Sequence, residues 1–204
     1  YALPSIIKLF REKYPEVRLS LYQGSPSRIV EMACSGEADI AIATEATSLT
    51  KDLAMLPCYQ WNRCVLTPPR HPLLKSKNLS LEEICSYPII TYDFTHTGRP
   101  IIKQTFEASG LEPDIILTAV DADVIKTYVE LGLGIGIVSM MAYDPVRDTK
   151  IRGMDASHLF EPSTTGIGIR KNTYMRGYIY DFISMFAPHL TRGAVDAIVS
   201  KQVR

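Results

Sequence analysis

Hydroxyl-bearing side chains stand out among the residues of this sequence that could bind a ligand. Thr44 ends an apolar run, and Thr95 and Thr97 lie in the polar loop that follows another such run. Ser25 directly precedes a proline that can begin a helix. Hydroxyl groups and the free N–H groups of helix N-termini donate hydrogen bonds to small anions. The pattern therefore suggests an anion-binding site built from neutral donors.

Each of these residues also has a simpler interpretation. Ser25 is favoured as the N-cap of the helix that begins at Pro26. Thr44 and Thr97 are as well explained by a strand end and a loop as by anion contact. Asp121 follows an apolar run at the same kind of position, but its carboxylate would repel an anion. We therefore interpret Asp121 as a helix cap.

The sequence contains little that could perform catalysis. A hydrolase needs a nucleophile beside a base, and no GxSxG motif occurs. The four histidines show no HExxH or similar spacing of metal ligands. Among them only His96 lies in a candidate ligand loop, where a hydrogen-bonding role is favoured over catalysis. We expect no enzyme activity, no catalytic residue, no metal site and no cofactor.

The elements that must position these residues are clearest between residues 114 and 140. Residues 114–119 form a short apolar run typical of a buried strand, and Asp121 can cap the helix that follows. Gly132 can end that helix, and the β-branched run 135–138 predicts a second strand. This βαβ order indicates a parallel sheet. The glycines after the helix do not indicate a dinucleotide site, because a phosphate-binding glycine loop precedes its helix.

The same layout is predicted near the beginning of the chain. The alternating residues 18–23 predict a strand, a helix follows from Pro26 to Gly36, and residues 38–44 predict the next strand. The remaining strands are predicted at 53–56, 63–67, 88–92, near 151 and at 166–170, and the remaining helices at 3–13, 80–87, 100–109, 175–186 and after 191. Residues 57–62, which contain a proline and the single tryptophan, are predicted to cross between two lobes.

The order of these elements predicts an α/β fold with two Rossmann-like subdomains. Residues 1–57 together with 163–204 form the first, and residues 58–162 form the second, which is inserted. Two crossover strands join them, as in type-two periplasmic binding proteins. Ligands of open α/β sheets bind beyond the carboxyl ends of the strands, so a ligand is expected between the two subdomains.

Composition restricts the possible partners. The 204 residues include 22 Lys plus Arg and 22 Asp plus Glu, so the net charge is zero. Binding to nucleic acid by this chain itself is not expected, because phosphate contacts need a basic surface. No apolar run reaches the ~18 residues of a membrane span. The four cysteines lack the spacing of metal sites and are interpreted as reduced thiols in the cytoplasm, namely Cys34, Cys58, Cys64 and Cys85.

Residues 2–44 resemble the start of the effector-binding domain of LysR-type transcriptional regulators. The family pattern of a proline-containing helix, FxxxYPxVxLxLxxG and GxxDxAI corresponds to LPSIIKLF, FREKYPEVRLSLYQG and GEADIAI. Three further segments resemble the CysB/Cbl branch of that family, and CysB in particular: LPCYQWNR at 56–63, DADVIKTYVELGLGIGI at 121–137 and YDFISMFAPHLTR at 180–192.

This resemblance implies a sensor function. Proteins of this branch are activators of sulfur assimilation and cysteine biosynthesis, and they bind a sulfate-like anion or an acetylserine-type effector between the subdomains. The DNA-binding winged helix-turn-helix precedes the effector domain in the family and is absent from this chain, so promoter DNA would be contacted only through that part. The implied assembly is a homodimer of this domain and a homotetramer of the full-length protein. RNA polymerase is a possible partner, and no membrane is expected.

The resemblance also implies site residues. Thr44 and Thr97 match hydroxyls of the family's anion site, and Trp61 matches a crossover tryptophan near the cleft. Ser25, Thr95 and Gly98 complete the set expected from the strand and helix ends. Two alternatives remain open: a cytoplasmic or secreted two-lobed solute-binding protein, and a two-lobed enzyme, which a turnover screen with sulfur metabolites would test.

Overall fold

The chain divides into two compact units in the computed structural model, which describes residues 2–44, 51–93 and 101–201. Unit 1 is Tyr1–Gln60 with Thr164–Arg204, and unit 2 is Trp61–Ser163. These limits lie within a few residues of the predicted ones. The described residues form two separate sheets, one of three strands and one of five.

Unit 1 is built around the three-stranded sheet, in the order β1-β8-β2. Its strands are β1 (Ala41–Thr44), β2 (Leu53–Trp61) and β8 (Ser163–Arg170), and its helices are α1 (Leu3–Lys13), α2 (Pro26–Ser35), α6 (Gly177–Phe186) and α7 (Arg192–Lys201). β1 pairs antiparallel to β8, with Thr44 opposite Thr165. The chain leaves unit 1 at the end of β2 and returns at the start of β8.

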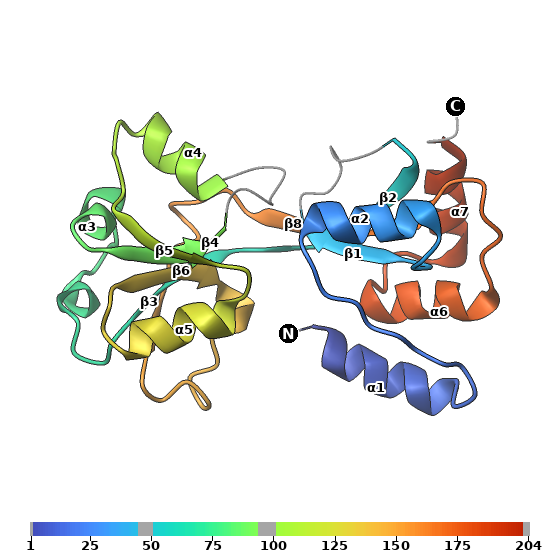
Figure 1. Ribbon diagram of the computed structural model, residues 1–204, viewed down its shortest axis with the longest axis horizontal. Coiled ribbons are helices and arrows are strands. Elements are labelled where there is room, and N and C mark those ends of the chain that lie inside the picture. The colour runs from blue at the N-terminus through green and yellow to red at the C-terminus, as the bar shows by residue number, and fades with distance from the viewer. Residues whose placement is uncertain (1, 45–50, 94–100, 202–204) are drawn as a thin grey trace. The chain divides into compact units, whose positions relative to one another are not determined.

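Helices cover both faces of this sheet (Figure 1). One face packs against α2 through Ala41, Ala43 and Leu53, which share a core with Val30 and Ala33. The other face packs against α6 and α7 through a second core: Leu56, Cys58, Ile167, Ile169, Ile179, Ile183, Phe186, Ala187, Leu190 and Val195. The alternation of side chains along each strand separates these two cores.

The predicted strand at residues 18–23 is wrong, because the structure assigns no strand there. The alternation of exposure is present only in part: Val17 and Leu19 are half-buried and Arg18 and Ser20 are exposed, but Leu21 is exposed as well. An alternating pattern determines which side chains face the protein, but it does not supply a hydrogen-bonded neighbour. Residues 17–22 instead line a cavity of about 360 Å³ within unit 1.

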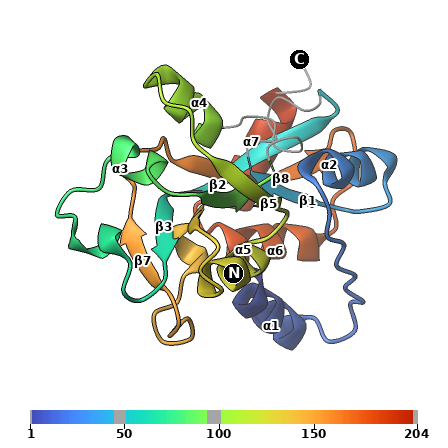
Figure 2. The same ribbon diagram turned by 60° about the vertical axis from the view of Figure 1, so that its left-hand side comes forward.

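Unit 2 contains the five-stranded sheet, in the order β5-β4-β6-β3-β7. Its elements are β3 (Arg63–Thr67), η2 (Pro72–Lys75), α3 (Leu81–Cys85), β4 (Ile89–Tyr92), α4 (Ile101–Ala108), β5 (Ile115–Ala119), α5 (Ala122–Glu130), β6 (Ile135–Ser139), η4 (Met140–Ala142) and β7 (Arg152–Asp155). β4 runs parallel to β5 and β6, so the predicted βαβ unit is confirmed. β3 is antiparallel to both β6 and β7, and its contact with β7 is visible in Figure 2.

Close packing of α5 on this sheet explains the glycines that follow the helix. Gly132 has a φ of +75° just after α5 and allows the chain to turn. At Gly136 a Cβ atom would lie 3.0 Å from Val129 and 3.1 Å from Ile125 of α5. These glycines therefore serve helix termination and packing, in agreement with the rejection of a dinucleotide loop.

Residues 57–61 are part of a strand, which corrects the predicted end of the strand at residue 56. β2 continues through Pro57 to Trp61. Pro57 is exposed, and a proline is tolerated where its missing N–H is not needed by a neighbouring strand. The change in composition that begins at Pro57 thus lies within β2, which passes from unit 1 to unit 2.

Candidate functional site

Ser25 acts as the N-cap of α2. Its hydroxyl oxygen accepts a hydrogen bond from the Arg28 N–H at 3.4 Å, and Pro26 follows at the first helical position. Gly36, with a φ of +83°, ends the helix. The favoured interpretation of Ser25 is confirmed. The hydroxyl hydrogen of a capping serine can still be donated, so capping and ligand contact are compatible.

Thr44 is the last residue of β1 and is half-buried. Its Oγ1 lies 3.2 Å from Oγ1 of Thr165, which is directly opposite on β8 and 6% exposed. The hydroxyl is therefore held at the carboxyl end of a strand, where ligands of α/β sheets bind. Thr165 was missed in the sequence, because only the antiparallel pairing of two distant segments brings it beside Thr44.

Trp61 lies at the end of β2 and contacts a buried cation. The guanidinium carbon of Arg63 is 5.0 Å from the centre of the Trp61 ring. Arg63 is only 7% exposed and donates hydrogen bonds to the Glu161 carbonyl at 2.9 Å and to Ser163 Oγ at 2.7 Å. Sequence reasoning missed Arg63, whose partners lie about a hundred residues further along the chain. Its effect is to fix the Trp61 ring by a cation–π contact.

The remaining predicted site residues fall outside the part of the chain that the structure describes. Thr95, Thr97 and Gly98 belong to residues 94–100, as does His96. Among the predicted residues, unit 1 therefore contributes Ser25 and Thr44, and unit 2 contributes Trp61.

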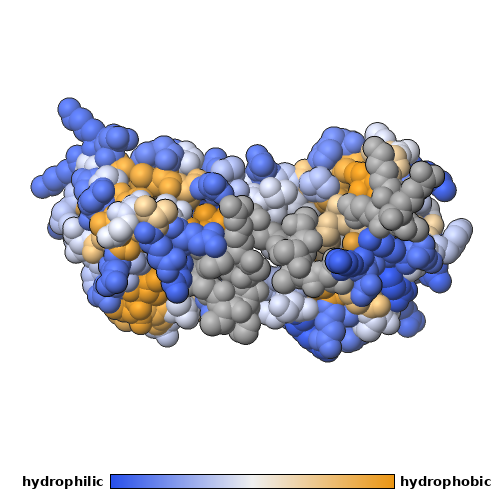
Figure 3. All heavy atoms as spheres, turned by 90° about the horizontal axis from the view of Figure 1, so that it is seen from above, coloured by the Kyte–Doolittle hydropathy of each residue, from blue (hydrophilic) through white to orange (hydrophobic). Residues whose placement is uncertain are grey.

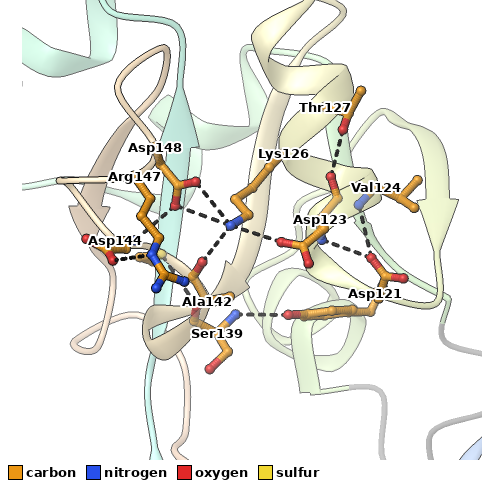
Figure 4. Close-up of polar contacts among 12 residues, drawn as sticks. Asp121, Asp123, Val124, Lys126, Thr127, Ser139, Ala142, Asp144, Arg147 and Asp148 are labelled. Carbon is orange, nitrogen blue, oxygen red and sulfur yellow. Dashed lines mark hydrogen bonds and ion pairs between the residues drawn. The ribbon is translucent and has the colours of Figure 1, made fainter. Parts of the chain in front are cut away.

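The carboxyl ends of the parallel strands in unit 2 bring together three polar residues. The Ser139 N–H, at the end of β6, donates to the hydroxyl of Tyr92 at the end of β4, at 3.2 Å. Burial raises the pKa of Tyr92 to about 12, so this residue is a neutral phenol at physiological pH. Asp121 accepts from the N–H groups of Asp123 and Val124 at 2.9 and 3.0 Å, which confirms its role as a cap (Figure 4).

Lys126 forms a polar network beside α5 that the sequence did not suggest (Figure 4). Its Nζ lies 3.2 Å from both carboxylate oxygens of Asp148, 3.0 Å from Asp123 and 3.0 Å from the Ala142 carbonyl. Burial lowers the pKa of Lys126, but hydrogen bonds to the two carboxylates outweigh it and the pKa is raised. The charged Lys126 side chain therefore connects α5 to the segment after η4, and we call this contact the tether.

All four cysteines are free thiols, and the described histidines contact the main chain. Burial raises the pKa of Cys58 to about 11 and that of Cys64 to about 12, which suppresses the reactive thiolate. Each described histidine contacts the main chain: His71 accepts from the Leu73 N–H, and the rings of His158 and His189 bond to the carbonyls of Leu79 and Pro57.

The described part of the chain comprises residues 2–44, 51–93 and 101–201. Within these ranges no group of three or more His, Cys, Asp or Glu residues is placed to hold a metal ion. Within the same ranges no helix combines the length and the apolar character needed to cross a membrane.

A family model, the LysR substrate binding domain, matches residues 1–191. The chain belongs to the LysR family of transcriptional regulators. This LysR substrate-binding domain is 52% identical over 203 residues to the HTH-type transcriptional regulator SsuR of Burkholderia cenocepacia, covering 100% of the chain and 66% of that relative. It is 50% identical over 196 residues to the HTH-type regulator CysB of Haemophilus influenzae, covering 96% of the chain and 60% of the relative.

Solved structures agree with this assignment. The cofactor-binding domain of the Cbl transcriptional regulator superimposes on the LysR domain with a TM-score of 0.92 at 40% identity, covering 98% of this chain and 87% of that one. The BenM effector-binding domain, solved with benzoate, has a TM-score of 0.74 at 21% identity and shows the fold alone. The fold is thus the two-subdomain α/β fold of LysR effector-binding domains, which is like that of periplasmic binding proteins.

Proposed function

We propose that this chain is the effector-sensing domain of a LysR-type activator of sulfur assimilation and cysteine biosynthesis. The identity of about half the residues to the regulators SsuR and CysB, over nearly the whole chain, carries the proposal. The chain spans 66% and 60% of the lengths of these relatives. Both relatives are named as HTH-type regulators, which favours a regulator over a solute-binding protein or an enzyme.

The proposed ligand is a sulfate-like anion or an acetylserine-type metabolite. Ser25 and Thr44 would contact it from unit 1. Trp61 would contact it from unit 2, together with three residues outside the described part of the chain, Thr95, Thr97 and Gly98. The support is chemical: Thr44 presents a half-buried hydroxyl at a strand end, and Ser25 begins a ten-residue helix. A ligand that contacts both units favours the arrangement in which it binds more tightly, as a sensor requires.

The proposed partners follow from the family. Promoter DNA would be contacted through an N-terminal DNA-binding domain and not through this chain, whose net charge is zero. The regulator would act in the cytoplasm and contact RNA polymerase. We also propose a homodimer of this domain and a homotetramer of the full-length protein.

Exposed apolar residues support the proposed dimer. On α5 and just after it, Val124 and Leu131 are 41% and 66% exposed, and they lie on one face of the helix with Thr127 and Tyr128. Ile116 on β5 is 46% exposed. Figure 3, which shows the molecule from above the view of Figure 1, shows further hydrophobic areas among hydrophilic ones on the surface of unit 2, at the left. Exposed apolar patches of this kind mark interaction surfaces.

Thermal unfolding with candidate effectors tests the proposed ligand class. We would titrate the full-length protein with sulfate, thiosulfate, O-acetylserine, N-acetylserine and adenylyl sulfate, using chloride at equal ionic strength as the control. A ligand at a hundredfold its Kd stabilises the folded state by about 2.7 kcal/mol, which corresponds to a Tm increase of about 5–10 °C. The absence of a shift with every compound would contradict the proposed ligand class.

A further inference from the structure

The hydroxyl of Tyr92 is a hydrogen-bond donor whose role is fixed by the sheet of unit 2. Tyr92 is the last residue of β4, and its Oη lies 3.2 Å from the main-chain nitrogen of Ser139, the last residue of β6. The dashed line at Ser139 in Figure 4 marks this bond. A main-chain N–H can only donate, so Tyr92 Oη is the acceptor. The single proton of the phenol is therefore left to be donated to another group.

The proton of Tyr92 has no acceptor among residues 2–44, 51–93 and 101–201, where the hydrogen bond from Ser139 is the one that Tyr92 makes. The ring itself is held in place, because it packs against the core that includes Ile90, Ile125 and Val138. The side chain is nevertheless only half-buried. Tyr92 thus combines a fixed ring with a surface that a ligand can reach.

A purely structural role explains only half of this arrangement. By accepting from Ser139, the phenol satisfies the last N–H of β6, and a buried N–H without a partner is costly. A carbonyl or carboxylate oxygen would satisfy that N–H equally well. A hydroxyl in this position adds a donor at the carboxyl ends of two parallel strands, where ligands of α/β sheets bind.

The charges around Tyr92 favour an acceptor that is negatively charged. Burial raises the pKa of Tyr92 to about 12, so the phenol keeps its proton at physiological pH. Of the two nearby groups that are charged at this pH, Arg63 lowers the pKa of Tyr92 by more than Asp121 raises it. The guanidinium thus outweighs the carboxylate at the phenol, and together they favour negative charge beside it.

We propose that Tyr92 is a further effector-binding residue of unit 2, whose hydroxyl donates a hydrogen bond to an oxygen atom of the bound anion. That oxygen belongs to a sulfate-like group or to the carboxylate of an acetylserine, which offer the same acceptor chemistry. The inference rests on the proposed function, which gives this chain an anionic effector. It adds a neutral donor that β4 itself supplies.

Calorimetric titration of the full-length protein with sulfate and, separately, with N-acetylserine tests this contact. Tyr92→Phe keeps the ring and removes only the hydroxyl. The affinity should fall about ten- to a hundredfold, the range of one hydrogen bond to a charged acceptor. A loss with only one of the two ligands identifies the group that Tyr92 contacts. An affinity within about twofold of the original for every ligand that the unchanged protein binds would overturn the proposal.

Thr91→Val is the matched control. Thr91 precedes Tyr92 on β4 and is fully buried, and its hydroxyl donates to the Ile137 carbonyl of β6 at 3.0 Å. The variant therefore removes a hydrogen bond between β4 and β6, as Tyr92→Phe does. We expect both variants to lower the Tm, but only Tyr92→Phe to raise the Kd. An equal loss of affinity in both would overturn the direct contact with the anion.

Tyr92→3-fluorotyrosine, introduced by nonsense suppression, tests the direction of the bond and provides a second variant if Tyr92→Phe does not fold. The fluorine makes the phenol more acidic, and the hydroxyl therefore becomes a stronger donor and a weaker acceptor. Because the pKa of Tyr92 is about 12, the modified phenol is still protonated at neutral pH. Tighter binding of the anion supports donation to the ligand, whereas unchanged or weaker binding overturns it.

Thr44→Ala in the same titrations separates the inference from the proposed function. Weaker binding in Thr44→Ala with unchanged binding in Tyr92→Phe overturns the inference and leaves the proposed site standing. Weaker binding in Tyr92→Phe with unchanged binding in Thr44→Ala supports the inference and removes the proposed contact from unit 1. If the unchanged protein binds none of the candidate effectors, the proposed ligand class and the inference are overturned together.

Discussion

Neutral hydroxyls, rather than fixed charges, are the residues proposed to hold the anion. Thr44 and Thr97 should each donate a hydrogen bond to it, and a bond to a charged acceptor contributes about 1.5–3 kcal/mol. Thr44→Ala and Thr97→Ala should therefore each weaken sulfate or thiosulfate binding about ten- to a hundredfold in calorimetry on the full-length protein. Thr118→Ala, at an exposed position of β5, is the control. Unchanged affinity in both site variants would remove the site but not the family assignment.

A second residue-scale prediction concerns the tether formed by Lys126. Lys126→Met leaves the Asp148 carboxylate, whose side chain is only 13% exposed, without its cation. Removal of one partner from a buried pair is costly, and we expect a loss of about 2–3 kcal/mol in the free energy of unfolding. Lys103→Met breaks an exposed pair with Glu107 and should cost less than about 0.5 kcal/mol. Urea unfolding compares the two, and equal losses would contradict the role of the tether.

At the residue scale, the sequence predicted those roles that depend on hydrogen bonds between residues close together in the chain. The caps at Ser25 and Asp121 follow from side chains that reach N–H groups two or three residues away, and both are confirmed. Arg63 and Thr165 escaped prediction because their roles depend on partners far along the chain. No spacing in a single sequence records such partners.

At the element scale, the contact between α1 and α6 gives a pH-dependent prediction. Asp181 of α6 accepts hydrogen bonds from Lys13 and Tyr14 at the end of α1. The hydrogen bond from Lys13, followed by that from Tyr14, lowers the pKa of Asp181. A lowered pKa stabilises the folded state above the pKa of the unfolded carboxyl, about 4, and this contribution is lost as the pH falls through the folded value.

Asp181→Asn tests this contact. Its free energy of unfolding should be lower than that of the unchanged protein near neutral pH, and the difference should shrink as the pH falls below about 4. Tyr14→Phe keeps the ring contact with Phe10 and should show a smaller difference of the same form. Unfolding curves recorded from neutral to acidic pH provide the measurement. A constant difference at every pH would exclude this role for Asp181.

Hydrophobic periodicity predicted some helices and strands correctly and others incorrectly. The βαβ unit of β5, α5 and β6 was predictable because each element packs apolar residues on the cores of unit 2. The run 114–119 was predicted to be a buried strand, but β5 lies at the edge of the sheet and its residues are half-buried or exposed. Residues 18–23 have the alternation of a strand but form none in the structure, since strand formation also requires a paired neighbour. Residues 57–62 were predicted to cross between the lobes after a strand that ends at residue 56, yet residues 57–61 continue β2, because an exposed proline does not interrupt a strand whose neighbour needs no hydrogen bond there.

At the scale of the whole molecule, the two-unit division was predictable from element order, and the ligand loop was not. Two apolar strand–helix–strand patterns separated by about a domain length indicated two lobes before any contact was known. The sequence of the candidate loop, residues 94–100, has no apolar periodicity. Without such a pattern, the sequence does not predict where the side chains of this segment lie. Its hydroxyls were singled out by position after a strand and by resemblance to the LysR family.

The last prediction concerns assembly. A homodimer built around a two-fold axis uses the same patch on both copies, so each change in the patch acts twice. We expect α1 of one copy to pack against the face of α5 that carries Val124 and Leu131, both exposed in a single chain. Val124→Glu with Leu131→Glu would place charges in both symmetric contacts, where burial without a partner is costly. Light scattering at tens of micromolar should then report a dimer for this domain and a monomer for the double variant. Val146→Glu changes an apolar residue that is 82% exposed and lies outside the face of Val124 and Leu131, in the segment that Lys126 connects to α5, and this control should remain dimeric. A monomer for the unchanged domain, or a dimer that survives both charges, would exclude this interface.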